Sequence, residues 1–490
     1  MKIFQREANM KRTFISVQIF LLILILAGPS CIFSDEQTKP DFSEAIRLID
    51  TWLEAQRDYD RLPGLSAAIV TDQEILWSKG YGMADIEKEV PSSADTIYSI
   101  CSISKLFTSV AIMRLRDAGK LRLDDLVAEH LSWFNLQQQY PDTGPITIRS
   151  LLTHSSGIPR ESDYPYWNGP DFPFPTTEQV KAKLGTQKTL YPPSTYFQYS
   201  NLGLALLGDI VAEVSGMPFE QYIEENILEP LRMADTRTKL PESLWRGKLA
   251  TGYSALKRDG TRDMLRLFQA RGIAPAAGFS STVEDLARFA SWQFRLLEKK
   301  GEEILKASTL REMQRVHWVD PDWQTTWGLG FSVREVDGRT MVGHSGGCPG
   351  YRTILNIDPH EKQAFIVMIN ACGTSPYIYA TGMREILKKV TGKNKEEKTR
   401  VNLEAYAGNY SAQPWGGETA IFPWQGKLAV FGLPSENPFR NLTLLKHIEG
   451  DTFRRLRNDE TLGEEVVFER DETGKVIRMW QHSTYSDKIR

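Results

Sequence analysis

The 490-residue chain is poor in cysteine, with only Cys31, Cys101, Cys348 and Cys372, so it is not a disulfide scaffold. Its seven histidines are scattered, with no H-x-x-x-H pair and no C-x-x-C, and we expect neither a metal nor a cofactor. A net charge of -3 gives no reason to expect nucleic acid or an anionic membrane surface as a partner. The composition is therefore that of a globular chain whose chemistry comes from ordinary side chains.

Long apolar runs are also missing, except for residues 14–28, which follow Lys11 and Arg12. This run is short for a bilayer span and precedes small residues, so we predict a signal peptide over residues 1–34 and export to the periplasm or the exterior. A lipid anchor at Cys31 is the weaker alternative, because residues 28–30 depart from the lipoprotein pattern. Membrane contact is expected only through this segment or that anchor, and the oligomeric state stays open.

Three cysteines remain once the signal peptide is removed, so at least one of them is unpaired. Cys101 and Cys348 each neighbour a candidate site residue. A bridge between them is conceivable, but two buried free thiols are the favoured prediction.

The length predicts at least two domains. Residues 42–59 have the apolar face of an amphipathic helix, and residues 65–71 and 74–82 alternate like two strands joined by a tight turn. A helical, loop-rich middle follows, and then come further strands and a last helix, at residues 340–342, 351–357, 364–370 and 378–390. This order predicts an α+β fold in which strands from both ends of the region meet in one sheet.

The last part of the chain has a different pattern. Residues 393–400 are charged and predict a linker, and residues 401–490 alternate short apolar stretches with turns. We predict a small all-β sandwich or barrel there. A packing or lid module is favoured over the alternative, a ligand-binding barrel that carries the function.

Ser102 and Lys105 begin an apolar helical run, three residues apart. This spacing places both side chains on one face of a helix, where a neutral lysine amine can take the serine proton and activate the hydroxyl as a nucleophile. The tetrapeptide alone is weak evidence, because it recurs as Ser254 and Lys257 just before the turn-like residues 258–260. That second copy is interpreted as surface.

Tyr199 and Asn201 stand directly before an apolar helix over residues 202–214. A tyrosine beside an activated serine can hold or shuttle a proton, if nearby cations favour its phenolate. The Asn201 amide can serve both the lysine and a substrate carbonyl. A second Y-x-N at residues 166–168 lies in a Pro/Gly-rich loop, and is interpreted as a substrate-side loop or plain surface.

Residues His344, Ser345, Gly346 and Gly347 follow a strand-like run. A glycine pair on an edge strand lets a substrate backbone approach, and the N–H of Gly347 could form an oxyanion hole with that of Ser102. His344, Ser345 and Gly346 are candidate substrate contacts. We expect His344, with an ordinary pKa of about 6.5, to make binding of an anionic substrate pH-dependent. A glycine-rich hairpin with a solvated histidine is the alternative.

Together and in this order, the three motifs resemble the serine β-lactamase / penicillin-binding-protein superfamily, in its class C β-lactamase, D,D-carboxypeptidase and esterase branch (peptidase S12). The resemblance covers about residues 42–391 and includes Ile146–Ile158, Pro275–Thr282 and Trp327–Phe331. It implies a β-lactamase/transpeptidase-like fold over residues 41–392, in which an antiparallel sheet flanked by helices accompanies a mainly helical lobe. Residues 401–490 resemble the lipocalin-like domain often appended to such proteins.

The resemblance also implies roles for single residues. Ser102 is the expected acylated nucleophile, Lys105 the general base or its partner, and Tyr199 the group that protonates the leaving group. Asn201 is expected to position Lys105 and the substrate amide. His344 stands where class C β-lactamases usually carry lysine, which argues against efficient β-lactamase activity.

The sequence thus predicts a serine hydrolase that cleaves an amide or ester through an acyl-serine. The expected substrate is a small molecule or peptide, with D,D-carboxypeptidase, D-aminopeptidase, esterase or β-lactamase-related activity. A penicillin-binding or ligand-sensing protein that does not turn over is the alternative. His154 and Trp327 are expected to be structural, with no catalytic role.

Overall fold

The computed structural model describes residues 41–391, 401–440 and 442–490. The predicted signal peptide, Cys31 and the predicted linker lie outside these residues and stay predictions. Over the described ranges no single helix is long and apolar enough to cross a membrane, although the pair Asn201–Ser215 and Phe219–Leu228, bent by 81°, passes that test together.

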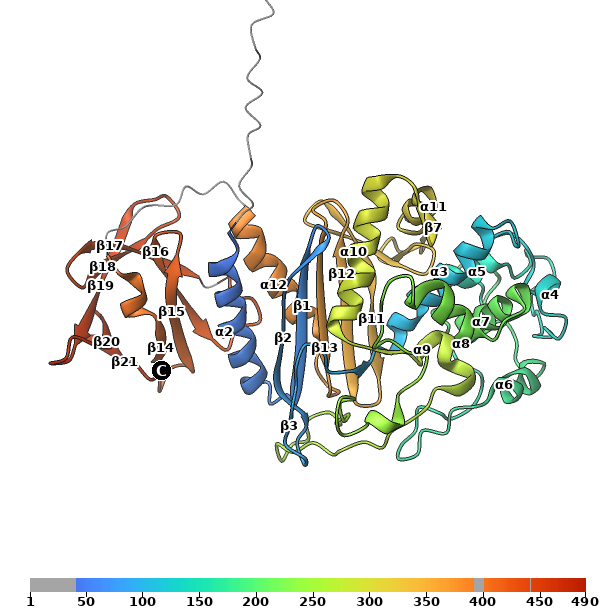
Figure 1. The fold of residues 1–490 in the computed structure, drawn as a ribbon, viewed down its shortest axis with the longest axis horizontal. Coiled ribbons are helices and arrows are strands. Elements are labelled where there is room, and N and C mark those ends of the chain that lie inside the picture. Colours follow the sequence, from blue (N-terminus) through green and yellow to red (C-terminus); the bar gives the residue numbers. More distant parts are fainter. Residues whose placement is uncertain (1–40, 392–400, 441) are drawn as a thin grey trace, which may run out of the picture. The chain divides into compact units, whose positions relative to one another are not determined.

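A nine-stranded antiparallel sheet organises the larger part of the chain, in the order β3-β2-β1-β13-β12-β11-β10-β9-β8 (Figure 1). The first strands pair with the last, so that Ala67 of β1 lies opposite Val367 of β13. This confirms the expected α+β fold with a discontinuous sheet. The strands are β1 (Gly64–Thr71), β2 (Glu74–Asp85), β3 (Val90–Pro91), β8 (Trp318–Val319), β9 (Thr326–Trp327), β10 (Ser332–Val336), β11 (Arg339–Cys348), β12 (Tyr351–Asp358) and β13 (Gln363–Ile369).

Helices cover both faces of this sheet (Figure 1). On one face lie α2 (Ser43–Tyr59) and α12 (Pro376–Thr391), and on the other lies α10 (Val283–Lys299). The apolar stripe predicted for residues 42–59 is the buried face of α2, where Ile49, Trp52 and Leu53 are fully covered. Two short pairs, β4 (Tyr98–Ser99) with β5 (Ser280–Ser281) and β6 (Glu302–Glu303) with β7 (Leu305–Lys306), complete this region.

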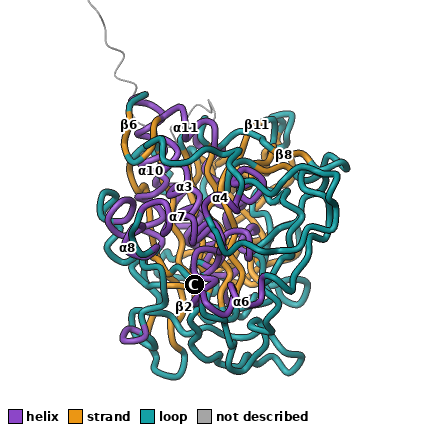
Figure 2. Tube along the Cα trace, turned by 90° about the vertical axis from the view of Figure 1, so that its right-hand side faces the viewer, coloured by secondary structure: helices purple, strands orange, loops and turns teal. Residues whose placement is uncertain are grey.

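The helical lobe has α3 and α7 at its centre, surrounded by shorter helices and loops (Figure 2). Helix α3 is buried on almost every side, which fits its position in the core rather than at the surface. It ends at Asp117, shortly before Gly119, which has a φ of 70°. The helices are α3 (Ser104–Asp117), α4 (Val127–His130), α5 (Ile148–Leu152), α6 (Thr177–Leu184), α7 (Asn201–Ser215), α8 (Phe219–Ile223), α9 (Ala274–Ala277) and α11 (Ala307–Met313).

Residues 401–490 form the predicted all-β region, an eight-stranded meander in which each strand pairs with the next. Its first and last strands approach each other through a bridge between Tyr410 and Lys488, so the sheet is nearly a barrel. Its strands are β14 (Gly408–Ser411), β15 (Glu418–Trp424), β16 (Lys427–Leu433), β17 (Thr443–Glu449), β18 (Thr452–Leu456), β19 (Leu462–Arg470), β20 (Val476–Gln481) and β21 (Thr484–Asp487).

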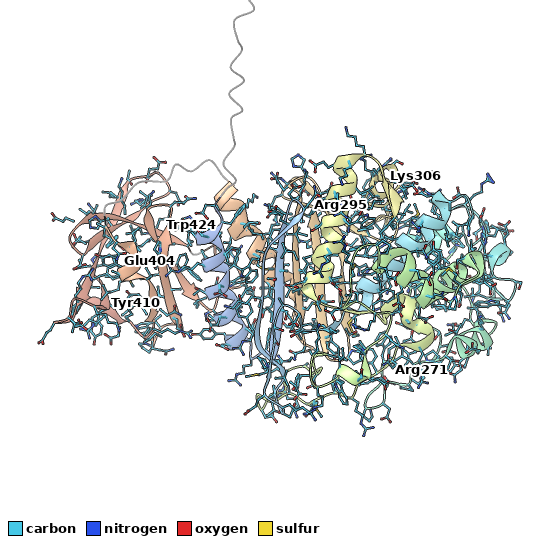
Figure 3. The ribbon with its side chains drawn as sticks, in the orientation of Figure 1. Arg271, Arg295, Lys306, Glu404, Tyr410 and Trp424 are labelled. Carbon is cyan, nitrogen blue, oxygen red and sulfur yellow. A yellow bond between two sulfur atoms is a disulfide. The ribbon has the colours of Figure 1, made fainter. Side chains whose placement is uncertain are left out.

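The meander meets helix α2. Trp424 lies on the side of the meander nearest α2 (Figure 3) and belongs to the same buried apolar cluster as Trp52. The Trp52 indole donates a hydrogen bond to the Ser435 carbonyl oxygen at 2.7 Å, and Arg47 pairs with Glu404 at 2.5 Å. The domain boundary placed at residues 393–400 stays a prediction.

Candidate active site

Ser102 lies in a tight turn that joins β4 to helix α3. Residues Cys101–Ile103 form a single 3-10 turn, and α3 begins at Ser104. Cys101 has a φ of 49°, a left-handed conformation that is uncommon for a residue with a side chain. The sequence predicted a helix from Ser102 onward, and the structure places the serine half a turn before it.

Lys105 is buried behind Ser102, with 1% of its surface exposed. Its Nζ lies 3.2 Å from Ser102 Oγ, 2.7 Å from Asn201 Oδ1 and 2.8 Å from the Ala276 carbonyl oxygen. Burial lowers the pKa of this amine well below its ordinary value of 10.5, and the Arg160 charge lowers it further against the opposite effect of Glu161. The predicted neighbours Ser102, Lys105 and Asn201 are therefore brought together.

Tyr199 lines the same cavity as Ser102, and its ring lies 4.8 Å from Lys105 Nζ. Its ring lies 4.4 Å from that of His154 and 4.9 Å from the Arg160 guanidinium. Burial raises the pKa of the phenol, and this outweighs the lowering by Ser102 and Arg160. The condition that nearby cations favour a phenolate is therefore not met, and Tyr199 is a neutral hydroxyl that can donate a proton.

Asn201 begins helix α7 and is 2% exposed. While its Oδ1 accepts from Lys105, its Nδ2 donates to both carboxylate oxygens of Glu161, at 2.8 and 3.1 Å. Because a carboxylate only accepts and a lysine amine at this distance donates, the two partners define which way the Asn201 amide points.

Glu161 was not singled out by the sequence. The hydroxyl of Tyr166 donates to this carboxylate, and Arg160 pairs with it at 3.1 Å. Tyr166 is fully buried, so the interpretation of its Y-x-N as a substrate-side or surface loop is wrong for the tyrosine itself. The available signal was that Glu161 is a charged residue three positions after the Ile146–Ile158 segment.

The predicted substrate strand is β11. It pairs with β12 through Cys348, but its pairing with β10 stops at Gly343. The edge of residues 344–347 that faces Ser102 therefore has no strand partner within the described ranges. Gly346 is packed so closely that a Cβ there would lie 2.3 Å from the Ile100 carbonyl oxygen.

His344 is 6% exposed, and its Nδ1 donates to the Ser345 carbonyl oxygen at 2.6 Å. Burial lowers the pKa of the imidazole to about 3, with a smaller contribution from Lys105. The expectation that His344 titrates near neutral pH is therefore wrong, and of a positive or a polar group it offers the polar one. A neutral histidine stands there, because desolvation disfavours the imidazolium.

A cavity of about 370 Å³ adjoins Ser102. Lys105, Asn201 and Gly346 are not among its lining residues, and neither is any described residue of 401–490. Arg160, Phe197, Ser332 and Tyr377 were missed because they come from separate loops, from strand β10 and from helix α12. The lining residues are Ser102, Arg160, Phe197, Tyr199, Trp327, Ser332, His344, Ser345, Gly347 and Tyr377.

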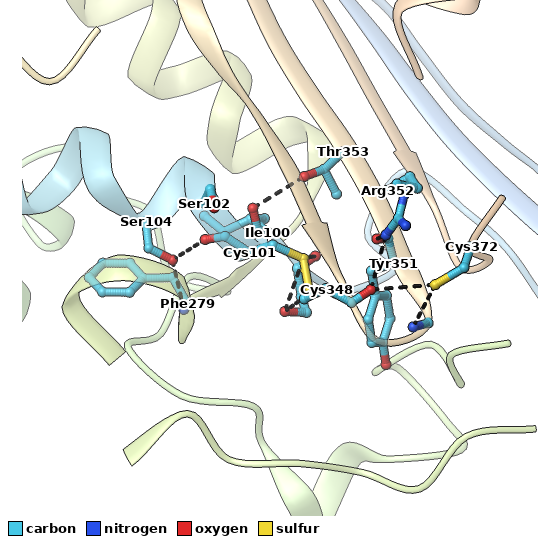
Figure 4. The surroundings of a disulfide bond; sticks show 12 residues. Ile100, Cys101, Ser102, Ser104, Phe279, Cys348, Tyr351, Arg352, Thr353 and Cys372 are labelled. Atoms are coloured by element: carbon cyan, nitrogen blue, oxygen red, sulfur yellow. Dashed lines mark hydrogen bonds between the residues drawn. A yellow bond between two sulfur atoms is a disulfide. The ribbon is translucent and has the colours of Figure 1, made fainter. Parts of the chain in front are cut away.

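Cys101 and Cys348 form a disulfide, with their Cα atoms 5.7 Å apart (Figure 4). The favoured prediction of two free thiols is therefore wrong. The two cysteines are 247 residues apart in the sequence, so their proximity could not be predicted from local patterns. They meet because β11 passes the turn before α3. Among the cysteines that the structure describes, Cys372 is the free one.

The second S-x-x-K copy lies at the surface, as predicted. Lys257 pairs with Asp263 at 2.8 Å, and the Ser254 hydroxyl donates to the carbonyl oxygen of Ala255. The same tetrapeptide spacing thus yields a solvated ion pair here and a buried amine at Lys105.

The sequence pattern of the family described as Beta-lactamase matches residues 49–383, which is more than half of the chain. The chain belongs to this family, and its fold is that of the serine β-lactamase and penicillin-binding-protein superfamily.

Two relatives and one solved structure illustrate the likeness. Beta-lactamase-like protein 2 of Dictyostelium discoideum is 27% identical over 384 residues, which cover 76% of this chain and 69% of that protein. Protein flp of Staphylococcus aureus strain MW2 is 27% identical over 330 residues, covering 66% of this chain and 62% of that protein. The octameric penicillin-binding protein homologue from Pyrococcus abyssi superimposes with a TM-score of 0.62 at 27% identity, covering 90% of this chain and 100% of that one. The chain thus spans about two thirds of these two relatives' length.

Proposed function

We propose that this protein is a serine hydrolase that cleaves an amide or ester through an acyl-serine intermediate. The observation that carries the proposal is the set of three oxygens around Lys105 Nζ. A neutral amine has two N–H groups and one lone pair. The Asn201 and Ala276 oxygens only accept and so take the two N–H groups, which leaves the lone pair for the Ser102 hydroxyl.

In the acylation step, Ser102 Oγ attacks the substrate carbonyl carbon while its proton passes to Lys105 Nζ. The carbonyl oxygen becomes an oxyanion, which the N–H groups of Ser102 and Gly347 would stabilise. As the bond to the leaving group breaks, the Tyr199 hydroxyl donates its proton to that group and regains one from Lys105. A water molecule then attacks the carbonyl carbon of the acyl-serine, with the same groups transferring its protons. The acid is released and the Ser102 hydroxyl is restored.

The proposed substrates are the same classes that the sequence predicts: a D-amino-acid peptide, a small ester or a β-lactam. Arg160 supplies the formal positive charge on the cavity wall, with its side chain 57% exposed, whereas His344 is neutral. Any anionic group of the substrate is therefore expected to meet Arg160 rather than His344.

The proposed setting is an exported protein acting on a small-molecule or peptide substrate. The Cys101–Cys348 disulfide supports export, because such bonds persist mainly in oxidising compartments.

The test is intact-protein mass spectrometry after incubation with a fluorescent penicillin or a fluorophosphonate, together with turnover of a chromogenic ester. Wild type is compared with Ser102→Ala and with Ser254→Ala, which removes the serine of the surface copy. We expect one adduct and steady turnover in wild type and Ser254→Ala, and neither in Ser102→Ala.

Two outcomes would contradict the proposal. An adduct that forms without turnover of any ester or amide would favour the penicillin-binding or sensing alternative. If folded wild-type protein reacts with neither probe, Ser102 is not an activated nucleophile.

A further inference from the structure

We propose that the Cys101–Cys348 disulfide is a positioning element of the oxyanion hole. This inference rests on the proposed acyl-serine chemistry. Cys101 directly precedes Ser102 and Cys348 directly follows Gly347, so the bond joins the neighbours of the two residues whose N–H groups are assigned to the oxyanion.

The bond lies where β11 has no strand beside it. Pairing with β10 ends at Gly343, and among the described residues the strand partner of β11 from there to Cys348 is β12, on its other side. On the side that faces Ser102, residues 344–348 therefore have no neighbouring strand to hold them in place. A covalent tie at Cys348 limits how far this edge can move from the nucleophile.

Two further contacts bring the turn and the strand together at the same point, and Figure 4 shows the one between Thr353 and Ile100. The absence of a side chain at Gly346 lets the Ile100 carbonyl approach, and the Thr353 hydroxyl of β12 donates to that carbonyl at 3.2 Å. These contacts constrain the approach of the backbones, whereas the disulfide also constrains their sliding along the strand direction.

The turn itself needs restraint. Cys101 is fully buried with a φ of 49°, and Cys348 is 5% exposed. A left-handed residue directly before the nucleophile persists when its surroundings hold it, and the disulfide is the covalent part of those surroundings. Release of the bond would allow the turn to relax and carry the Ser102 N–H away from Gly347.

Loss of the bond is expected to act on kcat rather than on KM. Oxyanion donors are used in the transition state, so their displacement slows the reaction without weakening ground-state binding by the same factor. A long loop closed by a disulfide also stabilises the fold, and a purely structural role would lower Tm while leaving kcat unchanged for the folded molecules.

The experiment compares wild type with the double variant Cys101→Ala/Cys348→Ala on a chromogenic ester, with Tm and active-site titration for each. The matched control is Cys372→Ser, since Cys372 lies beside the bond and accepts from the Gly350 N–H at 3.2 Å without belonging to it (Figure 4). For the double variant we expect kcat per titrated site to fall about tenfold or more and KM to change less than about twofold. Wild-type kcat in a folded double variant would overturn the inference.

A second measurement covers a double variant that does not fold. Wild type is produced in a reducing compartment and assayed before and after oxidised glutathione converts the two thiols to the disulfide, with release of two reduced glutathiones. Mass spectrometry counts the thiols. A rise in kcat on oxidation is expected, and equal kcat in both forms would overturn the inference.

The two proposals fail separately. Absence of Ser102-dependent turnover in oxidised wild type would remove the proposed hydrolase function. Turnover that depends on Ser102 but not on the disulfide would remove only the positioning role.

Discussion

The Asn201 side-chain nitrogen lies 2.8 and 3.1 Å from the two carboxylate oxygens of Glu161. This pairing turns the Asn201 oxygen toward Lys105 Nζ, 2.7 Å away. A carboxylate that does not line the cavity thus orients the amide that holds the proposed base.

Glu161→Gln tests this arrangement. A glutamine can donate as well as accept, so it offers Asn201 and Tyr166 one acceptor oxygen fewer and allows the Asn201 amide to turn. We expect kcat to fall about 10- to 100-fold, the range typical when a hydrogen-bond partner that orients a functional side chain is removed. The change in KM should be smaller. Steady-state kinetics on an ester measure both, and the exposed Glu229→Gln serves as the control. Unchanged kcat would show that Asn201 keeps its orientation unaided.

The pH dependence of kcat/KM reports the free enzyme, and Lys105 must lose its proton before Ser102 can attack. Since the pKa of Lys105 is lowered well below 10.5, we expect kcat/KM to rise with pH and to level off well below that value. His344→Gln should leave the position of this limb unchanged, because His344 is already neutral above about pH 3. Lys257→Met, in the surface copy, should change nothing. A limb that moves in His344→Gln would show that the histidine titrates in the working range.

Stability in acid is a separate consequence of His344. Its pKa is about 3 in the fold against an ordinary 6.5, so between these values the unfolded chain binds more protons than the native protein. The free energy of unfolding contributed by this group is therefore present above pH 6.5 and is lost as pH falls toward 3, by up to about 1.4 kcal/mol per pH unit. Urea unfolding from pH 4 to 7 should show a steeper acid loss in wild type than in His344→Gln. If the free energy of unfolding falls equally with pH in both proteins, His344 makes no such contribution.

Trp52 links helix α2 to both sheets. It is fully buried, its ring lies 6.1 Å from that of Tyr379, and a Cβ at Gly382 would meet it at 2.2 Å. We expect Trp52→Ala to lower the free energy of unfolding by about 3–5 kcal/mol through the cavity it leaves. Because Trp52 does not line the Ser102 cavity, kcat/KM of the folded fraction should stay unchanged. Denaturant unfolding with active-site titration measures both, and Trp415→Ala, at a 92% exposed residue, should cost less than about 0.5 kcal/mol.

The amino-acid sequence by itself determined the local elements and the three motifs. The helix of residues 42–59, the strands of residues 65–71 and 351–357 and the all-β C-terminal region follow from apolar periods that neighbouring residues carry. The proximity of Ser102 to Lys105 follows in the same way, because a three-residue spacing brings them together in any helical turn.

Only the tertiary structure decided which distant groups meet and which of them carry charge. The Cys101–Cys348 bond and the support of Asn201 by Glu161 and Tyr166 depend on contacts between segments that are separated in the sequence. The neutral states of His344 and Tyr199 depend on desolvation, which sums over all surrounding atoms and has no local pattern. For the same reason Lys105 and Lys257, alike in sequence spacing, differ in chemistry: one amine is enclosed by the fold and the other remains in water.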